Sequence, residues 1–209
     1  MIQTDNLTFR YKKTECTFCF PNIDLKEQEN LLILGKSGIG KTTLLHLLAG
    51  LLPPVSGKIV MEGVDINSLS HGQLDKFRGQ NIGLVFQKSH AVQSLNTVEN
   101  LQARLFFSKK SKNNILINNL LNQLGLDDCK KSKVNELSEG QLQRLGIALS
   151  VVHNPKVILA DEPTSNLDDD NCKIVIELLI NQAKRTNANL IVITHDHRIK
   201  SLFSNSIIL

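Results

Sequence analysis

The stretch LLILGKSGIGKTTLLHLL, at residues 31–48, decides the fold. It begins with an apolar run typical of a buried strand, and residues 35–42 match the pattern G-x-x-x-x-G-K-[ST] at every fixed position. In this pattern glycines turn backbone N–H groups toward phosphates, Lys41 reaches the outer phosphates, and the Thr42 hydroxyl ligates Mg2+. The stretch therefore predicts a nucleotide site between a strand and a helix. The alternative is a glycine-rich turn before an ordinary helix.

A second motif, VILADEP at residues 157–163, is an apolar run that ends in two acids. If the run is a strand, the acids lie at the carboxyl edge of the sheet, where the phosphate loop also lies. We expect Asp161 to hold Mg2+, directly or through water, and Glu162 to polarise or deprotonate the water that attacks the γ-phosphate. Two acids after a strand also fit a solvated turn, but their position after the glycine-rich stretch favours the catalytic interpretation.

Strand-like and helix-like segments alternate along the chain, which predicts an α/β fold. The apolar runs in three of the strands indicate burial on both faces, as in a parallel sheet covered by helices. The region at about 90–152 is expected to be a helical subdomain inserted into this core, within a single domain that spans residues 1–209. The expected strands are residues 4–9, 17–25, 31–34, 58–61, 82–86, 157–160, 190–194 and 207–209. The expected helices are residues 41–51, 98–106, 115–124, 139–152, 169–184 and 196–202.

Composition narrows the class of protein. The chain has 209 residues, 41% apolar and 21% charged, which is ordinary for a globular protein with one full core. The net charge of +4 comes with no Trp and with Tyr11 as the single Tyr, so a nucleic-acid partner is not expected. No apolar run approaches the ~18 residues that a membrane-spanning helix needs, and the N-terminus does not resemble a secretion signal. We therefore expect a cytoplasmic protein.

Cysteine spacing offers a weaker signal. Cys16 and Cys19 form one C-x-x-C, whereas Cys129 and Cys172 are isolated, so a zinc site would have to recruit distant histidines. The favoured interpretation is that the first two are buried or half-buried thiols of the strand at 17–25, in a reducing compartment.

Further motifs resemble those of one family. LSEGQ, at residues 137–141, resembles the signature LSGGQ of ATP-binding cassette (ABC) proteins, with Glu139 in place of a glycine. By itself it also fits a serine N-cap before a helix. Gln87 follows a strand as the family's Q-loop glutamine does, ITHD at 193–196 resembles the switch-histidine segment, and SNLD at 165–168 resembles the D-loop. The resemblance to an ABC nucleotide-binding subunit covers essentially the whole chain, in motif order.

This resemblance implies a RecA-like P-loop core, an N-terminal antiparallel β subdomain and an inserted helical subdomain. It also implies that two copies, or two similar subunits, pair head to tail around two ATP molecules. The signature segment at 137–141 of one copy would then serve the γ-phosphate of the other, with the N-terminus of the following helix pointing at the anion. His195 is expected to contact that phosphate and to orient Glu162 and the attacking water. Gln87 would approach Mg2+ and relay closure of the pair to an integral-membrane permease.

The implied site residues fall into three groups. The ATP-binding residues are Tyr11, which would stack on adenine, and Gly35, Lys36, Ser37, Gly38, Ile39, Gly40, Lys41, Thr42, Thr43, Ser138, Gly140, Gln141 and Asp168. The Mg2+ ligands are Thr42, Gln87 and Asp161, and the catalytic residues are Glu162, His195 and Gln87. The implied location is peripheral, on the cytoplasmic face of the cell membrane.

Within the family, the sequence at residues 82–87, 95–100 and 159–164 is most similar to the bacterial branch that serves lipoprotein release, macrolide efflux and cell division. Polar amino-acid importers share much of the same sequence and stay open as an alternative. Leu149 departs from the arginine that most members carry in the helix after the signature. Two functions stay open: a transport ATPase subunit, and an ATP-dependent regulatory switch of the cell-division type that signals through a membrane partner without moving cargo.

Overall fold

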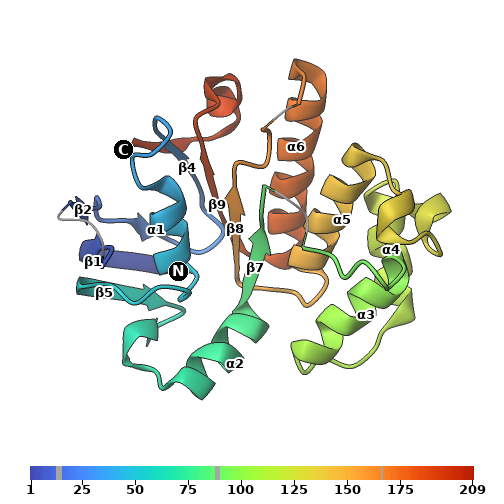
Figure 1. The fold of residues 1–209 in the computed structure, drawn as a ribbon, viewed down its shortest axis with the longest axis horizontal. Coiled ribbons are helices and arrows are strands. Elements are labelled where there is room, and N and C mark those ends of the chain that lie inside the picture. The colour runs from blue at the N-terminus through green and yellow to red at the C-terminus, as the bar shows by residue number, and fades with distance from the viewer. Residues whose placement is uncertain (13–15, 88–89, 166) are drawn as a thin grey trace.

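The computed structural model describes residues 1–12, 16–87, 90–165 and 167–209, so Asn166 of the predicted D-loop lies outside the described residues. Two sheets and several helices form the structure (Figure 1). The helix α1 (Lys41–Leu48) packs against both sheets, because its leucines share one apolar cluster with residues of each. The α/β fold predicted from sequence is confirmed.

The central sheet is parallel, and its strands lie in the order β10, β4, β9, β8, β7. Alternate residues of each inner strand face opposite clusters: Leu31 and Ile33 pack with α1, whereas Leu32 and Leu34 pack with the helices on the other face. Burial on both faces is what the apolar runs predicted. The bounds are β4 (Asn30–Leu34), β7 (Ile82–Val85), β8 (Val157–Asp161), β9 (Asn189–Thr194) and β10 (Asn205–Ile208).

The second sheet is antiparallel and forms around β1 (Ile2–Arg10), which lies between β2 (Thr17–Cys19) and β5 (Ser56–Met61). The single strand predicted at 17–25 is wrong: β2 and β3 (Asp24–Leu25) pair with β1 separately. Pro21 lies between them and has no N–H to donate to a ladder. The sheet is completed by β6 (Val64–Asp65), and Cys16 and Cys19 are exposed rather than buried or half-buried.

Helices follow one another between β7 and β8. They are α3 (Thr97–Phe107), α4 (Asn114–Gln123) and α5 (Glu139–Val151), joined by the 3-10 turns η2 (Asp127–Cys129) and η3 (Val134–Glu136). Asn96 caps α3 in a capping box with Glu99, and Ser138 caps α5 in one with Gln141, which explains where these helices begin. Leucines of all three helices pack into one cluster with the parallel sheet and α6 (Asp169–Thr186).

One helix was not predicted, namely α2 (His71–Asn81), and all of its side chains are half-buried or exposed. Its apolar residues are too few to give a helical period, but Ser70 and Gln73 form a capping box that could have revealed its start. The helix predicted at 196–202 is a 3-10 helix, η4 (His197–Leu202), and η1 (Ile66–Ser68) is another short 3-10 turn. Among the described residues, no helix has the length and apolar character needed to cross a bilayer.

Candidate functional site

The loop between β4 and α1 is shaped by two glycines in the left-handed region, Gly38 (φ +81°) and Gly40 (φ +106°). A side chain at Gly40 would be strained there, and its Cβ would lie 2.7 Å from the Phe18 ring. The loop is tied to the sheet by Gly35, whose N–H donates to the Thr194 carbonyl at 3.3 Å. The sequence therefore needs glycine at position 40 to bring the loop this close to β2.

Lys41 is the first residue of α1, and its side chain is only 6% exposed. Its Nζ donates to the carbonyls of Gly35 at 2.8 Å and Lys36 at 3.0 Å, so the chain curls back over the loop that precedes it. The same Nζ lies 3.3 Å from Oε1 of Glu162. The ammonium is thus fixed at the mouth of the loop, beside the acid that follows β8.

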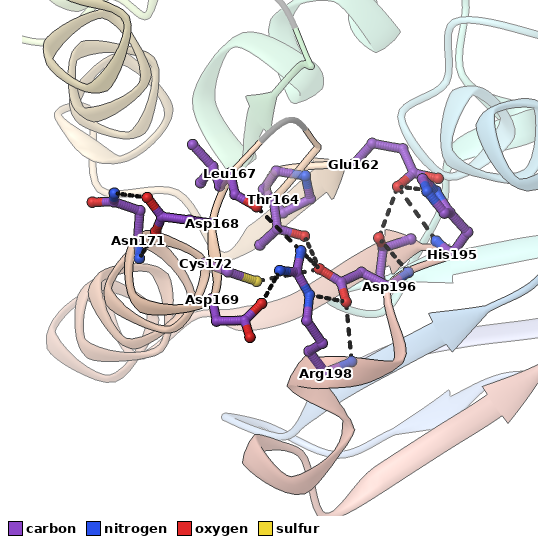
Figure 2. Close-up of polar contacts among 12 residues, drawn as sticks. Glu162, Thr164, Leu167, Asp168, Asp169, Asn171, Cys172, His195, Asp196 and Arg198 are labelled. Carbon is purple, nitrogen blue, oxygen red and sulfur yellow. Dashed lines mark hydrogen bonds and ion pairs between the residues drawn. The ribbon is translucent and has the colours of Figure 1, made fainter.

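Glu162 has an uncommon backbone conformation for a non-glycine residue, with φ +48°. Its Oε2 accepts hydrogen bonds from Thr194 Oγ1 at 2.7 Å and from His195 Nδ1 at 3.0 Å (Figure 2). Burial, the largest single cause, raises the pKa of Glu162. The hydrogen bonds from His195 and Thr194 and the charges of His195 and Lys41 together outweigh it, so the pKa lies below its ordinary value. Glu162 is therefore ionised at neutral pH and held in one orientation.

Asp161, the last residue of β8, is 8% exposed. Burial raises its pKa above the ordinary value, against the opposing effect of a hydrogen bond with Thr42. Its Oδ1 is buried and has no hydrogen-bond partner among the described residues. A buried carboxylate oxygen left in this way is costly, unless a cation or water takes the position.

Lys41, Glu162 and His195 line a cavity of about 470 Å³, whereas Asp161 lies outside its described lining, next to Glu162 in the chain. Tyr11 lies at its rim, where the hydroxyl hydrogen-bonds with Thr43 Oγ1 at 2.9 Å and the ring meets Phe9 edge to face at 4.8 Å. The cavity brings together many of the residues predicted from sequence, namely Tyr11, Ser37, Gly38, Gly40, Lys41, Thr42, Thr43, Gln87, Glu162 and His195.

Other predicted residues lie elsewhere in the described structure. Ser138, Gly140 and Gln141 form the start of α5, outside the lining of this cavity as described. Asp168 caps α6 by accepting a hydrogen bond from Asn171 N at 2.8 Å. Among the described residues, one chain therefore does not bring the signature segment to its own phosphate loop.

Two residues of the site were not singled out from sequence. Thr194 holds Glu162 through its hydroxyl, and Phe18 lines the cavity beside Tyr11, with ring centroids 6.2 Å apart. Thr194 is part of the ITHD motif at 193–196, so it could have been named. Phe18 could not, because its place depends on the pairing of β2 with β1.

Fold and cavity together define a P-loop nucleotide-binding protein, with a glycine-rich loop between the first parallel strand and its helix. Residues 21–165 match the family described as ABC transporter. The chain therefore belongs to the ABC transporter family. It is an ATP-binding and ATP-hydrolysing subunit of a transporter, as the resemblance of its motifs implied.

Two similar proteins are both ATP-binding subunits of lipoprotein-releasing systems. The lipoprotein-releasing system ATP-binding protein LolD of Buchnera aphidicola subsp. Acyrthosiphon pisum (strain APS) is 38% identical over 201 residues, which cover 94% of this chain and 88% of the relative. LolD of Buchnera aphidicola subsp. Schizaphis graminum (strain Sg) is 35% identical over 203 residues, with 95% and 89% covered.

Two solved structures superpose over nearly the whole chain. The ATP-binding cassette MJ0796, a dimer in a post-hydrolysis state bound to ADP and Pi, gives a TM-score of 0.89 at 30% identity and covers 100% of this chain and 94% of that one. The cassette cbiO1 from Clostridium perfringens, part of the ABC transporter complex cbiONQ, gives a TM-score of 0.87 at 27% identity, with 99% and 83% covered. Both the family and the cassette fold expected from sequence are thus confirmed.

Proposed function

We propose that two copies of this chain clamp two ATP molecules between them and use hydrolysis to drive an integral-membrane partner that releases lipoproteins. The observation that carries the pairing is the separation of two half-sites. Lys41, Glu162 and His195 converge on one cavity, whereas the signature segment at the start of α5 lies outside its described lining. The dimeric state of the similar cassette MJ0796 supports the same arrangement.

The start of α5 suits a phosphate from the opposite copy. Ser138 and Gly140 lie at the N-terminus of a 13-residue helix, where free N–H groups and the helix dipole favour an anion. Glu139 lies in the first turn and is exposed, so its carboxylate has room to point away from a bound phosphate. Gln141 closes the capping box with Ser138 and fixes this end of the helix.

Hydrolysis follows from the positions of Glu162 and His195. Glu162 accepts a proton from a water as that water attacks the γ-phosphorus, and the bond to the β,γ-bridging oxygen breaks to release ADP. His195 and Thr194 hold the carboxylate for this step. His195 uses Nδ1 for this contact, which leaves its other ring nitrogen, Nε2, to contact the γ-phosphate. Lys41 contacts the outer phosphates and stabilises the negative charge that they carry in the transition state.

Mg2+ fits the buried acid beside the cavity. The Oδ1 of Asp161 lacks a partner among the residues described, and a hard cation prefers carboxylate, hydroxyl and amide oxygens as ligands. Thr42, Asp161 and Gln87 would hold the ion, the first two near the phosphate loop and Gln87 from the end of β7. A bound ion would supply positive charge that offsets the negative charge of the phosphates.

The adenine is proposed to stack on Tyr11, with Phe18 beside it at the same rim. The hydroxyl of Tyr11 is held by Thr43, so the ring keeps its place above the start of α1. Gly35, Lys36 and Ile39 complete the proposed phosphate loop through their backbone rather than their side chains. The Gly35 N–H ties the loop to Thr194, and the Gly35 and Lys36 carbonyls hold Lys41. Asp168, at the start of α6, would face the opposite copy.

The membrane partner is proposed to bind a groove of about 460 Å³ between α2, β7, α3 and α5. The subunit itself would then lie at the cytoplasmic face of the membrane. Phe107 and Leu149 contribute apolar side chains to the lining of the groove, and Arg104 lines it as well. Arg104 Nη2 donates to the Ile82 carbonyl at 3.1 Å and to His153 Nε2 at 2.9 Å. Burial, followed by the charge of Arg104, lowers the pKa of His153 to about 3, so this histidine accepts as a neutral ring.

The two LolD relatives belong to lipoprotein-releasing systems, which supports lipoproteins as the transported class, and their similarity to this chain favours transport over a purely regulatory switch. The whole chain would act as one ATPase domain, with its helical region at about 90–152 next to the partner. Co-purification of the native complex from membranes tests this proposal. Recovery of a permease with bound lipoprotein would support it, and recovery of a partner that carries no cargo through repeated ATP cycles would contradict it.

A further inference from the structure

The guanidinium of Arg198 joins two segments that are distant in sequence (Figure 2). Its Nε and Nη2 donate to the two carboxylate oxygens of Asp196, at 2.9 and 2.8 Å. Its Nη1 pairs with Asp169, and Nη2 also donates to the Leu167 carbonyl at 3.3 Å. One side chain therefore holds both the segment that carries His195 and the segment that starts α6.

The Asp196 end of this link leads to the site. Asp196 accepts further hydrogen bonds from Thr164 Oγ1 at 3.1 Å and Cys172 Sγ at 3.2 Å, and its side chain is 10% exposed. Its backbone N–H donates to Thr194 Oγ1 at 3.0 Å, and that hydroxyl donates to Glu162 Oε2 at 2.7 Å. Hydrogen bonds at the carboxylate and at the backbone N–H of Asp196 thus connect the guanidinium, through this one residue and Thr194, to the proposed base.

The other end of the link lies at the surface. Asp169 is 84% exposed and Arg198 is 44% exposed, so an ion pair between them contributes little to folding stability. The planar fork of arginine does, however, fix the relative geometry of the groups that it binds. The contact is therefore better suited to hold the two segments in register than to stabilise the fold.

We propose that Arg198 is a positioning residue that couples the segment Leu167–Asp169 to Glu162 and His195 in the same copy. When the opposite copy contacts the start of α6, the guanidinium of Arg198 moves with this segment. Through Asp196 and Thr194 it then adjusts the position of the Glu162 carboxylate that activates water. The inference rests on the proposed pairing and on Glu162 as the base. It adds a residue that neither the phosphate loop nor the signature segment contains.

The test compares steady-state ATP hydrolysis by the full chain carrying Arg198→Gln, Asp169→Asn, or both. Rates are divided by the number of ATP molecules that each preparation binds, so that misfolded protein does not count. We expect Arg198→Gln to lower kcat by about tenfold or more, because a small displacement of a catalytic group costs this much, while KM changes by less than about twofold. Lys200→Gln is the control, since it removes an exposed positive charge from the same 3-10 helix.

Asp169→Asn cuts the surface end of the link and leaves the contacts to Asp196. It is expected to lower kcat in the same direction, and the double variant is expected to be no slower than Arg198→Gln alone, because both changes break one link. A further double variant, Glu162→Gln with Arg198→Gln, is expected still to form the ATP-dependent dimer. A substitution that only damages the fold would abolish ATP binding and dimer formation as well.

The inference is wrong if Arg198→Gln hydrolyses ATP at the wild-type rate, if its loss merely follows its loss of ATP-binding sites, or if Asp169→Asn is without effect. It is also wrong if Lys200→Gln is equally slow. These results would leave the proposed function intact. The proposed function fails separately if the single variant Glu162→Gln does not dimerise in the presence of ATP.

Discussion

The ammonium of Lys41 and the carboxylate of Glu162 lie 3.3 Å apart, although they come from the start of α1 and the end of β8. The pair is largely buried, with side chains 6% and 15% exposed. Because Lys41 also donates to two loop carbonyls, a phosphate that binds the ammonium must compete with Glu162 for it. Nucleotide binding and the freedom of the proposed base are therefore linked through a single side chain.

Replacing Lys41 by Ala is expected to weaken ATP binding by about tenfold to a hundredfold, since charge-assisted hydrogen bonds to phosphate are worth roughly 1.5–3 kcal/mol. Isothermal calorimetry with MgATP measures the change. Lys58→Ala serves as the control, because Lys58 is an exposed lysine on β5. Equal affinities for wild type and Lys41→Ala would remove Lys41 from the phosphate site.

Asp161→Asn is expected to stabilise the protein in EDTA and to abolish its response to Mg2+. The folded-state pKa of Asp161 is raised above its unfolded value, chiefly by burial, so the ionised form is disfavoured in the folded state. The penalty is present at neutral pH, begins to fall as pH drops through the folded pKa, where the wild-type acid takes up a proton, and is gone below the unfolded pKa. The Asn variant should gain about 1–2 kcal/mol in the free energy of unfolding at pH 7, and less at acidic pH.

Thermal melts at several pH values, with and without Mg2+, check this expectation. Asp128→Asn, an exposed acid in η2, gives the matched charge change away from the site. If Mg2+ raises the melting temperature of Asp161→Asn as much as that of wild type, Asp161 is not a ligand.

Tyr11 should contribute to nucleotide binding by stacking its ring on the adenine rather than through its hydroxyl. Tyr11→Ala is expected to weaken ADP binding by roughly fivefold to a hundredfold, the range given by 1–3 kcal/mol for a base stacked on an aromatic ring. Tyr11→Phe keeps the ring and loses the bond to Thr43, so it should bind nearly as wild type does. Inorganic triphosphate lacks the base, and its binding should be unchanged in both variants. Loss of triphosphate binding in Tyr11→Ala would instead indicate damage to the loop.

The groove between α2 and α3 offers a test with a close control. Phe107 lines the groove, whereas its neighbour Phe106 lies outside the described lining although the two are exposed to a similar extent, 74% and 75%. Phe107→Ser should reduce recovery of the membrane partner in pull-downs by several-fold and leave ATP binding intact, because it removes an apolar contact at the proposed interface. Equal recovery with Phe106→Ser and Phe107→Ser would place the partner elsewhere.

The sequence was most informative where local patterns coincide with burial. The run at residues 31–34 is apolar because both faces of β4 are covered, so its strand and the loop after it could be read directly. Prediction failed for α2, whose half-buried and exposed side chains leave no helical period, and for residues 17–25, where Pro21 separates two short strands. These elements are determined by contacts with β1 and β7 rather than by their own composition.

The residues of the site likewise divide into those that a local motif predicts and those that depend on contacts between distant segments. Lys41, Asp161 and Glu162 could be named because their motifs are local, and the structure brings them to one edge of the sheet. Arg198 could not, since its role depends on contacts with Asp169 and Leu167, which lie 29 and 31 residues earlier in the chain. Only the folded structure places these groups together.

In the proposed cycle, two copies close around ATP and Glu162 then activates water. Sedimentation of Glu162→Gln with and without MgATP, alongside its rate of hydrolysis, tests the claim most directly; Glu177→Gln, an exposed acid on α6, is the control. We expect Glu162→Gln to retain ATP binding, to form a dimer only with ATP, and to hydrolyse ATP at least about a hundredfold more slowly than wild type. A monomer at saturating MgATP, or hydrolysis at the wild-type rate, would contradict it.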